Sequence, residues 1–144
     1  MVTYSFDSNV LIDVLNDRAG ENRNRLNHLL AERLGLRVCS LVVHELTFGA
    51  AISRRPVYQS ELIRELLQRF RVEPLDEADA RSAVDVRVAL RREGLAIGPF
   101  DVLIAGQAIR RGWTMITRDF GEFGRIKGLA IESWPSVHDQ RPPR

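Results

Sequence analysis

The sequence is poor in the residues that cross-link small folds or anchor chains in membranes. It contains a single cysteine, Cys39, which excludes an intramolecular disulfide and a thiolate zinc cluster. No apolar run approaches the roughly 18 residues that a membrane-spanning helix requires, and no signal peptide is expected. The three histidines show no metal-ligand spacing. These absences favour a reducing, cytoplasmic compartment without membrane attachment.

Lysine is almost absent, whereas arginine is abundant. Twenty arginines and one lysine face 19 acidic residues, which gives a net charge of +2 and a pI of about 9.2. With 144 residues that are 44% hydrophobic, the chain fits one globular domain and not a disordered segment. Arginine pairs at 54–55, 91–92 and 110–111 could grip phosphates, although solvated helix ends explain them as well. Charge alone does not decide the partner.

Five short strand-like segments alternate with helical ones. The pattern predicts strands at 2–6, 36–40, 71–75, 113–117 and 129–133, and helices at 8–16, 21–34, 41–53, 56–70, 77–92 and 100–111. This alternation predicts an α/β fold, a three-layer α/β/α sandwich with a central, mostly parallel five-stranded sheet. We expect one domain over residues 1–134 and a flexible tail over 135–144. In such sheets ligands bind beyond the carboxyl ends of the strands.

Four acidic residues stand at or near that edge. Asp7 follows the first strand in an otherwise uncharged stretch, and Asp101 is the lone charge near the start of a mostly apolar helix. Glu45 lies within an apolar row of the helix expected at 41–53, and Asp119 follows the fourth strand. A carboxylate in low dielectric costs several kcal/mol unless it is paired, protonated or bound to a cation. The four residues are therefore candidates for one site.

Each acidic residue also has a structural explanation. Asp7 and Asp101 could cap helices, Asp119 could form a turn beside Arg118, and Glu45 could pair with a buried arginine. No basic residue is close in sequence to Asp7, Asp101 or Glu45, which weakens the explanation by an ion pair with arginine. A carboxylate cluster predicts Mg²⁺ or Mn²⁺ instead, because hard divalent cations take oxygen ligands. Such an ion can activate water and stabilise charge on a transferring phosphoryl group.

The acidic residues belong to four short motifs. These are FDSNVLID at 6–13, EL at 45–46 followed by Gly49, IGPFDVLIA at 97–105, and TRD at 117–119 followed by EF at 122–123. Together they resemble the PIN domain, and more closely its VapC-type toxin branch, from about Thr3 to Trp134. The resemblance implies a metal-dependent endoribonuclease that leaves 5′-phosphate ends and serves as the toxin of a toxin–antitoxin pair. It also implies Mg²⁺ (or Mn²⁺) as cofactor, a cognate antitoxin as partner, a homodimer and, most often, a transfer RNA substrate.

The resemblance gives individual residues roles. The catalytic and metal-binding quartet of the family falls on Asp7, Glu45, Asp101 and Asp119. Its polar helpers fall on Asn9 and Thr117, which are expected to orient the carboxylates or a bound water. A turn or a strand-end hydrogen bond would explain these two equally well. Arg118 and the pair Arg110 and Arg111 are the candidates for holding substrate phosphates.

Three other functions compete with the nuclease. A receiver domain needs a lysine beyond its last strand, whereas Lys127 precedes that strand. A haloacid-dehalogenase-type phosphatase needs an acid at the position of Asn9. A non-catalytic module that binds RNA or protein on the same fold stays open, and it would tolerate Asp7→Asn.

Three polar residues near the motifs are left out of the site. His44 adjoins Glu45 but points about 100° away around the helix, which favours a structural role. Asp13 is expected on an exposed helix face. Glu122 is expected to support a turn and not a metal ion.

Overall fold

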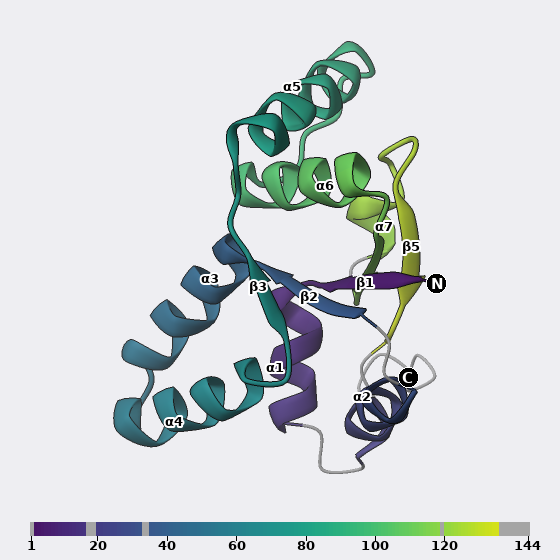
Figure 1. Ribbon diagram of the computed structural model, residues 1–144. Coiled ribbons are helices and arrows are strands. Elements are labelled where there is room, and N and C mark those ends of the chain that lie inside the picture. Colours follow the sequence, from purple (N-terminus) through teal and green to yellow (C-terminus); the bar gives the residue numbers. More distant parts are fainter. Residues whose placement is uncertain (1, 17–19, 33–34, 119, 136–144) are drawn as a thin grey trace, which may run out of the picture.

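A parallel sheet forms the centre of the molecule. The computed structural model describes residues 2–16, 20–32, 35–118 and 120–135. The strands pair in the order β3-β2-β1-β4-β5, and every pairing is parallel (Figure 1). Their bounds are β1 (Thr3–Phe6), β2 (Gly35–Cys39), β3 (Arg71–Glu73), β4 (Thr114–Thr117) and β5 (Ala130–Ser133). The predicted five-stranded α/β fold is confirmed.

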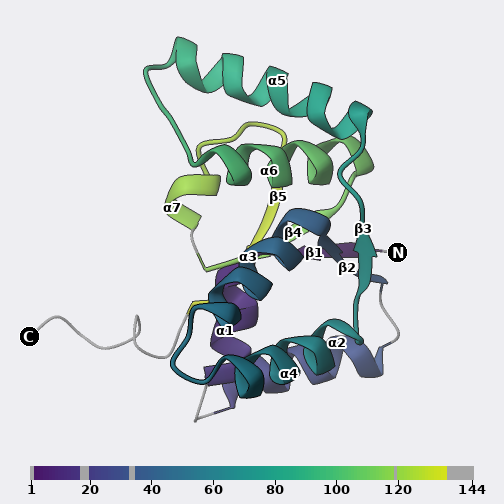
Figure 2. The same cartoon turned by 90° about the vertical axis from the view of Figure 1, so that its left-hand side faces the viewer.

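Helices cover both faces of the sheet. The described residues form α1 (Ser8–Asn16), α2 (Glu21–Ala31), α3 (Ser40–Ala51), α4 (Pro56–Leu67), α5 (Glu77–Arg92), α6 (Pro99–Arg111) and α7 (Phe120–Phe123). Helices α5, α6 and α7 lie on one side and α1 and α2 on the other, while α3 and α4 form an arm that projects sideways (Figures 1 and 2). None of the described helices is long and apolar enough to cross a membrane.

Local sequence signals explain most element boundaries. Pro56 and Pro99 occupy the first turns of α4 and α6, where a missing N–H costs nothing. Asp76 and Asp79 form a reciprocal capping box at the start of α5.

Strand β3 ends at Glu73, two residues before the predicted end, because the following proline cannot donate to the ladder. The helices predicted to reach residues 34, 53 and 70 end at 31, 51 and 67. Helix α7 was not predicted, because four residues show no helical periodicity.

The sheet order changes direction at β1. From this strand the chain moves through β2 to β3 on one side, and it later returns to place β4 on the other side. Ligands of open α/β sheets bind where the strand order reverses in this way. Asp7 follows β1 and Thr117 ends β4, so the fold brings these two buried residues together at that point.

Helices α5 and α6 pack closely at Gly106, and this contact gives a stability prediction. A Cβ at this position would lie 2.6 Å from the Ala83 backbone nitrogen and 2.7 Å from its Cα. Because backbone atoms cannot move aside cheaply, we expect Gly106→Ala to lower the free energy of unfolding by about 1–3 kcal/mol. Thermal unfolding followed by circular dichroism measures the effect. Gly49→Ala is the control, because nothing lies within 4 Å of its added Cβ. Equal melting temperatures for the two variants would contradict the prediction.

Candidate active site

Asp7 is held rigidly at the carboxyl end of β1. Its side chain is 3% exposed. The Ser8 backbone N–H donates to Oδ1 at 2.8 Å, and the Thr117 hydroxyl donates to Oδ2 at 2.9 Å. The Asp7 N–H itself donates to the Ile116 carbonyl at 2.9 Å. These contacts fix the carboxylate between β1 and β4, and they place Thr117 where it orients an acidic side chain.

Glu45 comes to the same edge from α3. Its Oε1 atom is buried and has no hydrogen-bond partner among the described residues. Burial raises the pKa of Glu45 and the negative charge of Asp101 raises it further, while His44 and a hydrogen bond with Ser8 act in the opposite direction. The net result is a pKa above the ordinary glutamate value. The described part of the chain holds no arginine or lysine in ion-pair distance of Glu45, so the buried ion pair considered from sequence is not observed there.

Asp101 lies in the first turn of α6 and faces Glu45. The two carboxylates line one cavity of about 220 Å³ together with Gly98, Pro99 and Phe100. Gly98 is the N-cap of the helix, and its N–H donates to Glu122 Oε1 at 3.1 Å. Glu122 therefore supports the turn before α6, as expected. A negative charge in a first helical turn is favourable. The helix start thus carries Asp101 to the carboxylate edge.

Asn9 and Arg118 connect α1 to the end of β4. The Arg118 N–H donates to Asn9 Oδ1 at 3.3 Å, and the Arg118 guanidinium donates to Asp13 Oδ1 at 2.8 Å. The Asp13 side chain is only 13% exposed, so the prediction of an exposed helix face is wrong. Residue spacing within α1 could not reveal this ion pair, because its partner lies 105 residues away.

Arg110 and Arg111 are not near the carboxylates. They lie at the opposite end of α6, roughly 14 Å from Asp101 at 1.5 Å of rise per residue. Both guanidiniums donate to Asp79, each at 2.8 Å, and Arg111 also donates to Glu73 Oε2 at 2.9 Å. The structure thus places this pair in an ion-pair network of the α5–α6 hairpin, and not where the sequence-based hypothesis put phosphate contacts. The fourth acidic residue of the quartet, Asp119, lies outside the described residues.

The donor atoms suit a hard divalent cation. Within residues 2–118 and 120–135, apart from the short gaps at 17–19 and 33–34, no three acidic, histidine or cysteine side chains form a compact metal-binding group. Carboxylate oxygens are nevertheless the ligands that Mg²⁺ and Mn²⁺ prefer. The buried Glu45 oxygen without a hydrogen-bond partner is the kind of atom that a cation would satisfy. The residues present fit such an ion.

This fit predicts a measurable effect of Mg²⁺ on stability. A raised carboxyl pKa means that the metal-free protein loses stability as the pH rises from the ordinary glutamate value through the raised one. Glu45→Gln removes that cost, so we expect a higher melting temperature near neutral pH without metal. In the wild type, Mg²⁺ at 100 times its Kd should add about 2.7 kcal/mol, and less below pH 5.

Differential scanning fluorimetry with Mg²⁺ and with EDTA measures both effects. Glu61→Gln, on the exposed side of α4, is the matched control and should leave the Mg²⁺ response unchanged. An Mg²⁺ response of the same size in Glu45→Gln as in the wild type would exclude Glu45 from the cation site.

Comparison with known proteins identifies the family of the chain. The PIN domain model matches residues 4–129. The tRNA(fMet)-specific endonuclease VapC of Shigella flexneri is 31% identical over 134 residues, which cover 93% of this chain and 99% of that protein. The chain belongs to the PIN domain family, in its VapC branch. Another VapC relative, ribonuclease VapC2 of Rickettsia felis, is 29% identical, with 91% and 97% of the two chains covered.

Solved structures of VapC proteins share this fold. VapBC2 from Rickettsia felis, bound to a DNA fragment from its promoter, superimposes with a TM-score of 0.86 at 27% identity, covering 93% of this chain and 99% of that chain. DNA-bound VapBC from Salmonella typhimurium gives 0.85 at 30% identity, with the same coverage. All four motifs singled out from the sequence lie inside the region that the PIN domain model matches.

Proposed function

We propose that this VapC-branch protein is a metal-dependent endoribonuclease that acts as the toxin of a toxin–antitoxin pair and is neutralised by a cognate antitoxin. The observation that carries this proposal is that Glu45 and Asp101 line one cavity, while Glu45 also forms a hydrogen bond with Ser8, the residue after the buried Asp7. The Oε1 atom of Glu45 is buried and has no hydrogen-bond partner among the described residues. The relatives named as endonucleases and ribonucleases support the reaction class. The solved VapBC assemblies support an antitoxin partner.

The mechanism follows from the cation that the carboxylate side chains can bind. Asp7, Glu45 and Asp101 supply oxygen ligands, and the family resemblance adds Asp119 as the fourth. Thr117 fixes the orientation of Asp7 through the 2.9 Å hydrogen bond to Oδ2. Mg²⁺, or Mn²⁺ in its place, supplies Lewis-acid stabilisation of the negative charge that develops on the scissile phosphate. Hydrolysis releases the ribose 3′-oxygen and leaves a 5′-phosphate on the other product.

The exposed apolar side chains of the protein are an argument for protein partners. Around the α3–α4 arm and the α5–α6 hairpin these are Phe48, Ile52, Val57, Tyr58, Val84, Val88 and Phe100. His44 stacks on Phe48, with ring centroids 6.5 Å apart, and meets Phe100 edge-on at 5.8 Å. Large apolar groups that gather on a surface mark interaction sites. We propose that an antitoxin and a second copy of the chain cover this surface, and that the protein acts in the cytoplasm.

Incubation with RNA tests the function directly. The purified, antitoxin-free protein is mixed with total bacterial RNA in the presence of Mg²⁺, Mn²⁺ or EDTA. Discrete cleavage that requires the metal is expected, with transfer RNA as the favoured substrate. If a folded, antitoxin-free preparation cleaves no RNA with either metal, the alternative of a non-catalytic RNA- or protein-binding module on the same fold replaces the nuclease.

A further inference from the structure

A second cavity adjoins the carboxylates. It has a volume of about 360 Å³ and lies between the end of α5 and the start of α6. Its lining includes the apolar residues Leu95, Ile97 and Pro99 and the two arginines Arg87 and Arg91. Pro99 also lines the cavity of Glu45 and Asp101, so the two cavities meet at this residue. We call it the Arg87 cavity.

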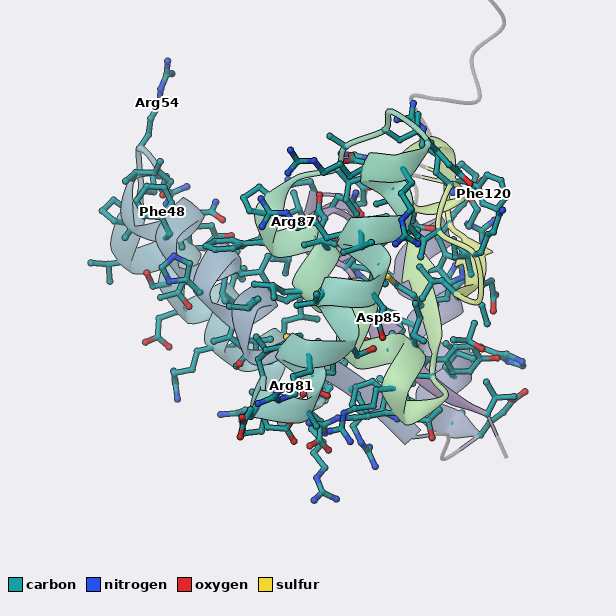
Figure 3. All side chains as sticks on the ribbon, turned by 90° about the horizontal axis from the view of Figure 1, so that it is seen from above. Phe48, Arg54, Arg81, Asp85, Arg87 and Phe120 are labelled. Carbon is teal, nitrogen blue, oxygen red and sulfur yellow. The ribbon has the colours of Figure 1, made fainter. Side chains whose placement is uncertain are left out.

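The two arginines of this cavity have no acidic partner among the residues that the structure describes. Arg87 and Arg91 are one helical turn apart on α5 and therefore neighbours on one side of the helix. In the described part of the chain neither forms an ion pair, whereas Arg81 of the same helix binds Glu77 at 2.8 Å. No acidic side chain among the described residues lines the cavity. Figure 3 shows Arg87 on the side of the hairpin that points toward the α3–α4 arm with Phe48.

The helix dipole accounts for Arg91 but not for Arg87. A cation near a helix C-terminus is stabilising, but this effect decays within the last turn. Arg91 and Arg92 are in that turn, whereas Arg87 lies more than one turn before the end of α5. Arg87 therefore calls for a different reason, and an anion in the adjoining cavity provides one.

We propose that the Arg87 cavity binds a nucleotide of single-stranded RNA next to the scissile phosphate, an inference that rests on the proposed nuclease function. One guanidinium can donate two parallel hydrogen bonds to the oxygens of a phosphate. Unstacked bases pack against the plane of a guanidinium and against apolar side chains. Positive charge here also offsets the repulsion between RNA and the acidic edge.

The cavity on the other side of Glu45 makes a useful contrast. It has a volume of about 190 Å³, lies between α1, α3 and α4, and includes Ile12, Asn16 and Gln59 but no arginine. Both cavities border the carboxylates, yet only the Arg87 cavity carries positive charge among the described residues. Charge complementarity therefore assigns the phosphate-bearing flank of the substrate to the α5–α6 side.

Binding measurements test the proposal without cleavage. The full chain carrying Asp7→Asn is titrated onto a fluorescein-labelled single-stranded oligouridylate in Mg²⁺ at several salt concentrations. We expect Arg87→Gln and Arg91→Gln each to raise the Kd several-fold. Each should also reduce the slope of log K against log salt by about 0.7, the value for one lost phosphate contact on a single strand. Lysine at either position should restore most of the slope. Arg92→Gln, on the next residue of the same helix, should match the parent.

A second pair of variants probes the cavity without removing an arginine. Ala96 is exposed and lines the cavity, so Ala96→Asp adds a negative charge there while Ala96→Ser adds none. With Asp7 intact, Ala96→Asp should raise the KM for RNA cleavage several-fold with little change in kcat, and Ala96→Ser should not.

Three outcomes would overturn the proposal. If the Arg87→Gln Arg91→Gln double variant binds RNA like Arg92→Gln while the parent binds normally, the cavity is not a nucleotide site and the nuclease function stands. If these variants instead change the oligomeric state or antitoxin binding, measured by light scattering, the cavity belongs to a protein interface. If the parent neither binds nor cleaves RNA, the proposed function fails first, and the nucleotide site with it.

Discussion

Asp7→Asn is expected to lower kcat/KM for RNA cleavage by about 10³-fold, equivalent to roughly 4 kcal/mol of transition-state stabilisation. The amide has the volume of the carboxylate but not its charge, so the proposed cation site loses one of its charged ligands. It also replaces one acceptor with a donor at a position where Ser8 N–H and the Thr117 hydroxyl both donate. Asparagine Oδ1 can still accept from Ser8, but the Thr117 hydroxyl has to turn and accept from the Nδ2 group, which replaces a charge-assisted hydrogen bond with a weaker neutral one.

Asp7→Asn should lose RNA-cleaving activity without a matching loss of thermal stability. Near neutral pH and without metal, Asp7→Asn removes a buried negative charge, which offsets the weaker hydrogen bonding of the amide. We therefore expect a melting temperature close to that of the wild type. Single-turnover cleavage at saturating Mg²⁺ measures the loss of activity. Asp85→Asn, on the exposed face of α5, should cleave normally, and cleavage by Asp7→Asn within tenfold of the wild type would exclude Asp7 as an essential ligand.

Asp79→Asn is expected to cost about 3–5 kcal/mol of the free energy of unfolding, the typical penalty for breaking a buried ion pair. Asp79 is 0% exposed and binds both Arg110 and Arg111 at 2.8 Å. Gln107 donates to it at 3.1 Å, as does the Asp76 backbone N–H. An asparagine could not compensate two guanidinium charges, and its amide donors would face these donors. Because the network joins α5 to α6, its loss loosens the helix that carries Asp101.

The pH dependence of this effect has a definite sign. Burial alone raises the pKa of Asp79, but the bonds from Arg111, the Asp76 backbone, Gln107 and Arg110 outweigh it and hold the pKa far below the ordinary aspartate range. A depressed carboxyl pKa contributes stability that is complete above the unfolded-state value, about 3.9, and is lost as the pH falls through the folded-state value. The difference between the wild type and Asp79→Asn should therefore be constant from pH 5 to 8 and shrink below about pH 4.

Urea unfolding across this pH range provides the measurement. Asp85→Asn lies on the exposed face of the same helix and should stay within about 0.5 kcal/mol of the wild type at every pH. A difference of less than 1 kcal/mol between Asp79→Asn and the wild type at pH 7 would mean that the network contributes no net stability.

The sequence was most informative where charge interrupts an apolar pattern. Asp7, Glu45 and Asp101 could be selected in this way, because each stands nearly alone among residues that have to be buried. The parallel sheet also followed from the alternation of strands and helices. Both signals are local or periodic, and a single sequence displays them directly.

Contacts between distant elements could not be predicted in the same way. The Arg118–Asp13 pair and the attachment of Arg110 to Asp79 depend on which helix faces which strand, and no spacing within one element encodes that choice. The Arg87 cavity has the same origin. It is lined by residues of α5, of α6 and of the segment between them, and these two helices pack closely at Gly106.

The insertion of β4 beside β1 also determines when, during synthesis, the proposed nuclease can become active. Asp7 leaves the ribosome early, but its hydroxyl partner Thr117 is 110 residues further along the chain. A growing chain that lacks β4 can neither orient Asp7 nor close the edge on which the carboxylates meet. Folding generally follows the order of synthesis, and long-range strand pairing comes late. Under the proposed nuclease function, RNA cleavage can therefore begin only after β4 has been made and paired with β1.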